Sequence, residues 1–216
     1  MMKSLLIVFL ILFTGCTKKD NSQSTMNETQ KINLLENNNL DKWTFYLTDS
    51  TVSPDLIWSV KNGIVLCTGS VNGYMRTKQE FSNYKLSLDW RWPGEPGNSG
   101  VLLHITGKDK VWPKCIEAQL MSGTAGDFFL IDSTDINERL DKTSNRVEKK
   151  NESSENAPGE WNHYEIVCSG DSIMVYVNDV LQNQASGASV SKGWIGLQSE
   201  GAPIEFRNIS VELLKP

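Results

Sequence analysis

Regular alternation of apolar and polar residues along three neighbouring segments constrains the fold of this chain more than any other feature. The segments Tyr84–Trp92, Gly100–Ile105 and Lys114–Met121 each carry an apolar residue at every second position. Because side chains alternate faces along a strand, this pattern predicts half-buried β-strands. If the three strands lie side by side over one core, the opposite face collects residues able to do chemistry, namely Asp89, Arg91, His104, Glu117 and Gln119. The pattern therefore indicates a sugar-binding surface or an active site on that face.

The rest of the chain continues the same rhythm, with turn signals such as Lys61-Asn62-Gly63 and Gly170-Asp171 between short apolar runs. We find no convincing amphipathic helix after the N-terminal segment and no repeat. This favours an all-β antiparallel sandwich or jelly roll. The charged, amide-rich segment Asn137–Asn156 is expected to form a long solvated surface loop rather than a lid.

The N-terminus is typical of an exported protein. Lys3 precedes an apolar run, Leu5–Phe13, which is too short for a transmembrane helix and is followed by Thr14-Gly15-Cys16. The small residues before Cys16 resemble a bacterial lipobox, which implies lipidation of Cys16 and a location in the bacterial cell envelope. An ordinary cleaved signal or a short membrane anchor is the alternative. We therefore expect a signal peptide at 1–15, a flexible tether at 16–31 and one domain at 32–216.

Charge and cysteine content narrow the class of partner. The net charge is −5 and neither Lys nor Arg forms a stripe, which argues against nucleic acid. Membrane contact is expected only through the lipid anchor, and the oligomeric state is left open. Cys67, Cys115 and Cys168 allow at most one disulfide and lack metal-ligand spacing. Cys115 is expected to be a small, partly buried thiol.

Five short motifs appear in an order that resembles a known family, the 3-keto-disaccharide hydrolase domain, formerly a domain of unknown function. They are Pro96-Gly97-Asn98-Ser99-Gly100-Val101, Glu117-Ala118-Gln119, Pro158-Gly159-Glu160-Trp161-Asn162, Gly196-Leu197-Gln198 and Phe206-Arg207-Asn208-Ile209. The similarity extends over about Ile32 to Leu214. The resemblance implies a concanavalin A-like jelly roll with its site on the concave face. It also implies action on glycosides oxidised to a ketone at C3, by hydrolysis or by elimination of the aglycone.

The candidate residues suit such chemistry. A ketone at C3 acidifies the C2 hydrogen, so a base, a donor for the enolate oxygen and an acid for the leaving oxygen are needed. We assign His104 as the base, Arg91 to the enolate, and Glu117 as the acid or an alternative base. The expected substrate-binding residues are Asp89, Asn98, Gln119, Trp112, Trp194 and Gln198.

Plainer interpretations stand beside these. Asp89 and Arg91 could form a structural pair, His104 could be a structural histidine, and His163 is expected to face solvent. The whole domain could be a carbohydrate-binding module without catalysis. A conventional endo-glycosidase needs two carboxylates, and Gln119 stands where jelly-roll glucanases carry their second acid. No cofactor is expected, although His104 and the acids could hold a divalent metal.

Overall fold

Two antiparallel sheets form the described part of the chain, residues 30–215, in a computed structural model. This confirms the all-β jelly-roll prediction. The expected signal peptide, Cys16 and nearly all of the expected tether lie outside the described residues. The only helices among residues 30–215 are two short 3-10 turns, η1 (Glu36–Asn38) and η2 (Pro54–Leu56).

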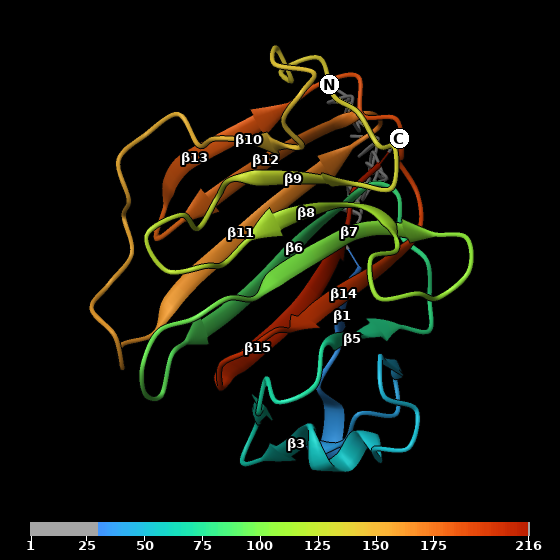
Figure 1. The fold of residues 1–216 in the computed structure, drawn as a ribbon, viewed down its shortest axis with the longest axis vertical. Coiled ribbons are helices and arrows are strands. Elements are labelled where there is room, and N and C mark those ends of the chain that lie inside the picture. The colour runs from blue at the N-terminus through green and yellow to red at the C-terminus, as the bar shows by residue number, and fades with distance from the viewer. Residues whose placement is uncertain (1–29, 216) are drawn as a thin grey trace, which may run out of the picture.

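The eight-stranded sheet has β6 near its centre and lies behind the seven-stranded sheet in the view of Figure 1. Its strands, in spatial order, are β13 (Val180–Ala185), β12 (Ser172–Val177), β11 (Asn162–Ser169), β6 (Tyr84–Arg91), β15 (Ile204–Leu213), β4 (Ile64–Cys67) and β3 (Trp58–Lys61), with β1 (Lys31–Asn33) also paired to β15. Those of the seven-stranded sheet are β10 (Arg146–Val147), β9 (Phe128–Ile131), β8 (Lys114–Gln119), β7 (Gly100–Thr106), β14 (Trp194–Ser199), β5 (Gly73–Thr77) and β2 (Trp43–Leu47).

The main core fills the space between the sheets. Trp90 of β6 is fully buried and packs against Tyr164 of β11, with ring centroids 5.2 Å apart. Leu86 and Leu88 continue the same buried face. Fully burying one such apolar side chain contributes roughly 1.5–3 kcal/mol, so this alternation fixes which face of β6 points inward.

The prediction that the three alternating strands lie side by side is wrong for one of them. Strands β7 and β8 are paired, but β6 belongs to the other sheet, between β11 and β15. Alternation fixes the inward parity of a strand, but it does not say which sheet the strand joins. Asp89 and Arg91 alternate with the buried residues Leu88 and Trp90, so they lie on the outer face of the eight-stranded sheet.

A β-bulge in β7 overturns a second expectation, the position of His104. The register with β8 shifts between Leu103 and Thr106, and His104 has φ +56°. Leu103 lies in the main core, as predicted, but beyond the shift Ile105 joins a different cluster on the other face of the sheet. A bulge adds one residue and therefore reverses the alternation that follows it. His104 consequently turns away from the polar face on which it was expected.

The segment expected to be a solvated loop is instead attached to both sheets. Arg146 and Val147 form the edge strand β10 against β9. Farther along, the Lys150 backbone N–H donates to the Gln182 carbonyl, and the Ser154 hydroxyl donates to the Val177 carbonyl. These bonds carry the segment from the edge of one sheet to the edge of the other, which closes that side of the sandwich.

Two further expectations concern cysteines and membrane-spanning segments. Cys67, Cys115 and Cys168 are all buried free thiols, and Cys115 is a small buried thiol as expected. Burial raises the pKa of the Cys67 thiol to about 11, so it stays protonated at neutral pH. Within residues 30–215, no helix has the length and apolarity that crossing a bilayer requires.

Candidate active site

The site lies on the face of the seven-stranded sheet that points away from the main core. One cross-strand row runs across this sheet from β5 to β9. Its members, each opposite the next in the neighbouring strand, are Arg76, Gly196, Leu102, Glu117 and Phe129. A second apolar cluster forms the floor beneath it. Its members are Tyr74, Leu102, Ile105, Cys115 and Ile131, with Tyr46, Phe129 and Trp194 packed against them.

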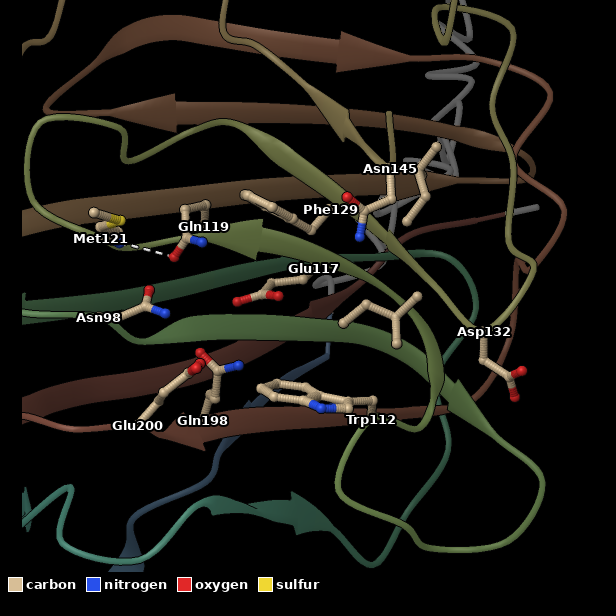
Figure 2. A pocket seen from close by; sticks show the side chains of 12 residues that line it. Asn98, Trp112, Glu117, Gln119, Met121, Phe129, Asp132, Asn145, Gln198 and Glu200 are labelled. Carbon is tan, nitrogen blue, oxygen red and sulfur yellow. Dashed lines mark hydrogen bonds between the residues drawn. The ribbon is translucent and has the colours of Figure 1, made fainter. Parts of the chain in front are cut away.

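A cavity of about 440 Å³ opens above this floor, within the range of small-molecule sites. Figure 2 shows its polar side chains pointing toward a common centre from β8, β14 and the loop before β7. The lining residues are Asn98, Trp112, Glu117, Gln119, Met121, Phe129, Leu130, Ile131, Asp132, Asn145, Gln198 and Glu200. No lysine, arginine or histidine is among them, so the pocket offers carboxylates, amides and aromatic surface.

Glu117 is the most unusual group in the pocket. Its side chain is only 4% exposed, and Oε1 has no hydrogen-bond partner. Burial, reinforced by the negative charge of Glu200, raises the pKa of Glu117 to about 8. The carboxyl group lies over Gly100 of β7, where any Cβ would collide with Oε1. The glycine therefore creates the space that Glu117 occupies, which explains its place in the motif.

Glu200 is a second carboxylate that the sequence analysis missed. It follows β14, and its backbone forms bridges with Asn98 on the loop before β7. Burial raises the pKa of Glu200 as well. Its parity is that of Gln198, two residues earlier, so continued alternation beyond the end of the strand would have revealed it. The pocket is therefore lined by three carboxylates, Glu117, Glu200 and Asp132, and Asp132 is paired with Lys110 at 2.7 Å.

Three predicted binding amides do line the pocket. Asn98 Oδ1 and Gln198 Oε1 are buried without a hydrogen-bond partner. Gln119 Oε1 instead accepts from the backbone N–H groups of Leu120 and Met121, both at 2.8 Å. Gln119 therefore braces the end of β8, whereas Asn98 and Gln198 are free to bind a ligand. Buried polar atoms without partners are costly, and a ligand with hydroxyl groups would satisfy them.

The two predicted stacking tryptophans differ. Trp112 lines the pocket and is 42% exposed, so a ring face is available to a sugar. Trp194 is half-buried, and the Arg76 guanidinium lies 3.9 Å from its ring centroid. Because that face of Trp194 is already covered, the structure does not place this residue as a sugar platform.

Asp89 and Arg91 are not brought to the pocket, and they do not pair with each other. Arg91 Nε donates to Glu205 at 2.6 Å. Asp89 accepts from His163 at 2.8 Å, from Arg207 at 3.0 Å and from Asn208 at 2.7 Å. Burial opposes ionisation of Asp89, but these hydrogen bonds outweigh it and lower its pKa. His163, expected to face solvent, is part-exposed but engaged in this cluster.

His104 is also absent from the pocket, because the bulge turns it into the interior. It is fully buried, and its ring packs edge-on against Tyr84 of the opposite sheet at 5.6 Å. Nδ1 lies 3.2 Å from the Val190 carbonyl oxygen. Burial lowers the pKa of His104 to about 4, which leaves the ring neutral at pH 7. The structural interpretation of this histidine therefore fits its surroundings.

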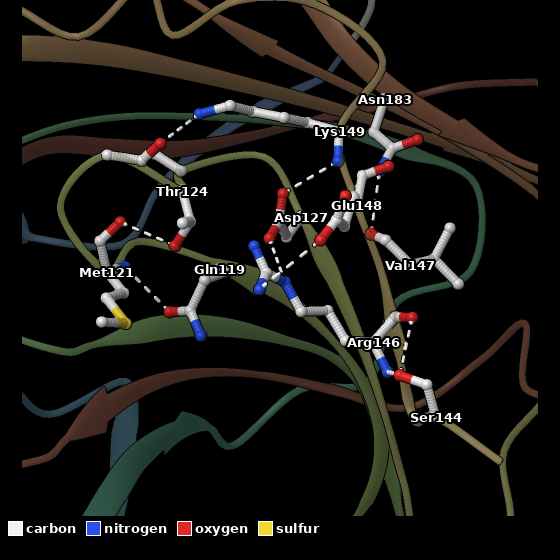
Figure 3. Close-up of polar contacts among 12 residues, drawn as sticks. Gln119, Met121, Thr124, Asp127, Ser144, Arg146, Val147, Glu148, Lys149 and Asn183 are labelled. Carbon is white, nitrogen blue, oxygen red and sulfur yellow. Dashed lines mark hydrogen bonds and ion pairs between the residues drawn. The ribbon is translucent and has the colours of Figure 1, made fainter.

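One wall of the pocket comes from the segment that was expected to be solvated. Asn145, immediately before β10, lines the cavity. Figure 3 shows how its neighbour is held: Arg146 Nε donates to buried Asp127 at 2.6 Å, and the Lys149 backbone N–H donates to the same carboxylate at 2.8 Å. Asp127 thus anchors this segment beside the pocket.

No group of three or more His, Cys, Asp or Glu side chains able to hold a metal ion occurs in the described part of the chain. A metal site formed by His104 together with Glu117, left open by the sequence, does not form, since these two residues face opposite sides of the sheet.

Comparison with known proteins follows this geometry. The chain matches the family described as the 3-keto-alpha-glucoside-1,2-lyase-like domain over residues 30–212. The chain belongs to this family. The 3-keto-alpha-glucoside-1,2-lyase-like domain therefore accounts for nearly all described residues, which confirms the resemblance seen in the motifs. Curated proteins give no significant match.

Solved structures share the fold of this lyase-like domain. A proposed glycosyl hydrolase from Parabacteroides distasonis has a TM-score of 0.64 at 22% identity, covering 86% of this chain and 100% of that one. The carbohydrate-binding module CBM66 from Bacillus subtilis scores 0.58 at 15% identity, covering 79% and 95%. A β-glucanase from Bacillus licheniformis scores 0.56 at 14% identity, covering 87% and 98%. Family and fold together indicate a carbohydrate-active protein of the glycosyl-hydrolase-like jelly-roll class.

Proposed function

We propose that this protein cleaves 3-keto-glycosides, with Glu117 and Glu200 as its acid–base pair. The observation that carries the proposal is a pocket in which Glu200 lies with Glu117, whose Oε1 is buried and unpartnered and whose pKa is raised to about 8. Family membership supports the substrate class. Carboxyl groups in a pocket whose pKa is raised by burial are candidates for acid–base catalysis.

The reaction needs one proton removed and one supplied. A base takes the C2 proton, and the C–H electron pair moves into the C3 carbonyl to give an enolate. That electron pair then forms a C1–C2 double bond while the C1–oxygen bond breaks, and the departing oxygen takes a proton from an acid. Later addition of water to the unsaturated ketone gives the hydrolysis product.

We assign Glu117 as the acid and Glu200 as the base. With a pKa of about 8, Glu117 is mostly protonated at neutral pH and can give its proton to the leaving oxygen. Since the lining residues include no cation, we assign the amide N–H groups of Asn98 and Gln198, among the N–H donors of the pocket, to the enolate. These four residues replace His104 and Arg91 in the roles first assigned to them.

Two substrates with different leaving groups test the assignment. Methyl and 4-nitrophenyl 3-keto-glucosides would be incubated in D₂O with the wild type, Glu117→Gln and Glu200→Gln. We expect Glu200→Gln to lose deuterium exchange at C2 with both substrates. Glu117→Gln should keep exchange, lose methanol release and retain nitrophenolate release, because nitrophenolate needs no acid.

The exposed carboxylate Glu95, on the loop leading to Asn98, provides a control, and Glu95→Gln should behave like the wild type. Wild-type exchange and cleavage in both active-site variants would disprove the assignment. Sugar affinity without any release would instead identify a non-catalytic binding module.

A conventional endo-glycosidase is the second candidate, and one observation favours it. Glu117 and Glu200 face one pocket, and ordinary glycosidases place two carboxylates on either side of the scissile bond. Turnover of an unoxidised glucan at a rate equal to or above that of its 3-keto form would establish this candidate and displace the first.

We also propose that the protein is anchored in the cell envelope through lipidated Cys16. The motif Thr14-Gly15-Cys16 after a short apolar run supports this proposal. A Cys16→Ser variant should move from the membrane fraction to the soluble fraction on cell lysis. Unchanged fractionation would reject the anchor.

A further inference from the structure

The loop between β7 and β8, residues 107–113, extends over the face of the seven-stranded sheet that carries the pocket. Asp109 on this loop accepts two hydrogen bonds from Arg76, from Nε at 2.8 Å and from Nη2 at 2.8 Å. It also accepts one from the Tyr74 hydroxyl at 2.9 Å. Arg76 and Tyr74 belong to β5, which is separated from β7 by β14. The loop therefore crosses over β14 to reach its anchor.

The next residue along the loop is held on the opposite side. Lys110 Nζ lies 2.7 Å from Asp132, immediately after β9. Trp112, from the same loop, lines the pocket (Figure 2). Two adjacent residues thus tie the loop to strands on either side of β7 and β8, and this arrangement sets the position of Trp112.

The Asp109 anchor lies at the β5 end of the cross-strand row that starts at Glu117. Arg76 shares its cross-strand row with Glu117, through Gly196 and Leu102. The Arg76 guanidinium covers the Trp194 ring at 3.9 Å, and its side chain is only 13% exposed beneath Asp109. From Glu117 toward β5, the space above the sheet is therefore filled by protein.

The pocket is also bounded on its other side, from Glu117 toward β9 and β10. Phe129 and Asn145 line the pocket there, and the Asp127–Arg146 ion pair holds the segment that contains Asn145. Sugar units can therefore continue from the pocket neither over β5 nor freely over β10. This geometry fits a short ligand or one terminal unit.

We propose that Asp109 determines ligand length: by holding the β7–β8 loop on Arg76 and Tyr74, it closes the β5 side and restricts the site to short glycosides or chain ends. The identity of the sugar rests on the proposed function, whereas the closure rests on the Asp109 contacts alone. A bidentate carboxylate–guanidinium pair with a third hydrogen bond fixes position well, since each added bond restricts the loop further.

Amide hydrogen exchange tests the closure independently of any substrate. In full-length protein, Asp109→Ala should raise exchange at residues 107–113 by about tenfold or more, because the loop loses all three bonds. The control Lys108→Ala changes an exposed residue of the same loop and should leave exchange as in the wild type. Equal exchange in Asp109→Ala and the wild type would overturn the closure.

A length series tests the consequence for specificity. The probes are a 3-keto-disaccharide and a tetrasaccharide with an internal 3-keto unit, compared by kcat/KM. The wild type should prefer the disaccharide by about tenfold or more, and Asp109→Ala should reduce this ratio mainly through KM for the tetrasaccharide. Asp109→Asn, which keeps the shape and part of the hydrogen bonding, should lie between the two.

The outcomes separate the two proposals. Equal use of both probes by the wild type, or an unchanged ratio in Asp109→Ala, would overturn the length restriction while leaving the 3-keto proposal standing. Failure of the wild type to cleave or bind either probe would remove the proposed function, and with it the length restriction on glycosides. The exchange measurement would then decide the loop closure by itself.

Discussion

The two outward faces of this sandwich carry similar residues but use them differently. On the outer face of the eight-stranded sheet, Asp89 has three donors, Arg91 is paired with Glu205, and Trp161 lies under the Arg91 and Arg207 guanidinium groups at 4.5 and 4.0 Å. Each of these charged groups has a partner within the protein.

On the pocket-bearing face of the seven-stranded sheet, by contrast, several buried polar atoms have no hydrogen-bond partner. Glu117 Oε1, Asn98 Oδ1 and Gln198 Oε1 are all buried without partners, and they line the same pocket. Leaving such groups unsatisfied costs stability, roughly 1–3 kcal/mol each. The comparison teaches that residue type alone does not identify a site. The pocket is marked by several unpartnered polar groups that line one cavity.

The largest expected contrast between the faces is in activity. Glu117→Gln should lower kcat/KM on methyl 3-keto-glucoside by about 10²–10⁴, the usual contribution of a positioned acid. Asp89→Asn, an equivalent change on the outer face, should alter it by less than about threefold, since Asp89 is remote from the pocket. Steady-state kinetics on both variants provide the test. A comparable loss in Asp89→Asn would erase the functional distinction between the faces.

The next effect is on stability as a function of pH. The folded pKa of Glu117, about 8, lies above its unfolded value near 4.5, so folding favours the protonated form. Its contribution is fully present below pH 4.5 and is lost as pH rises through 8, by roughly 5 kcal/mol. Glu117→Gln cannot ionise and should lack this decline. Urea unfolding at pH 5, 7 and 9 would reveal it, and parallel pH profiles for wild type and variant would refute the assignment.

Loss of a partnered carboxylate should be costly for folding. Asp89→Ala removes the acceptor for His163, Arg207 and Asn208 at a site where the Asp89 side chain is 14% exposed. We expect a loss of about 2 kcal/mol, because three donors lose a common partner. Thermal unfolding would measure it, and surface Asp171→Ala is the control for a simple change of charge.

The smallest contrast concerns two tryptophans. Trp161→Ala should destabilise the fold by about 1 kcal/mol through lost cation–π contacts, with no change in sugar affinity. Trp112→Ala should do the reverse, weakening sugar binding by about tenfold with little loss of stability, since Trp112 is 42% exposed in the pocket wall. Calorimetric titration of a sugar would measure affinity and thermal unfolding would measure stability in both variants. Loss of affinity in Trp161→Ala, or loss of stability alone in Trp112→Ala, would contradict the prediction.

Most of the fold could be predicted from sequence because alternation reports burial directly. The inward residues of β6, such as Leu88 and Trp90, were identified correctly, and the pairing of β7 with β8 was as expected. Alternation is a local property, however, and sheet membership depends on contacts between distant segments. The assignment of β6 beside β7 failed for that reason.

Alternation along the strands also predicted part of the pocket. Asn98, Trp112, Glu117, Gln119 and Gln198 line one pocket, and their roles in binding or catalysis stay predictions. Glu200 was missed because it follows the end of β14, in a stretch interpreted as a turn. Asn145 was missed because a charged segment gives no signal of the sheet edge it occupies.

The extra residue in β7 has a consequence for comparing members of this family. A relative without the bulge would keep strict alternation after Leu103, and its residue in place of His104 would then face the side of the sheet that carries the pocket. Alignments that treat this strand as uninterrupted would therefore equate an interior residue with an active-site one. A single insertion or deletion here changes which chemical group an evolving strand presents to the substrate.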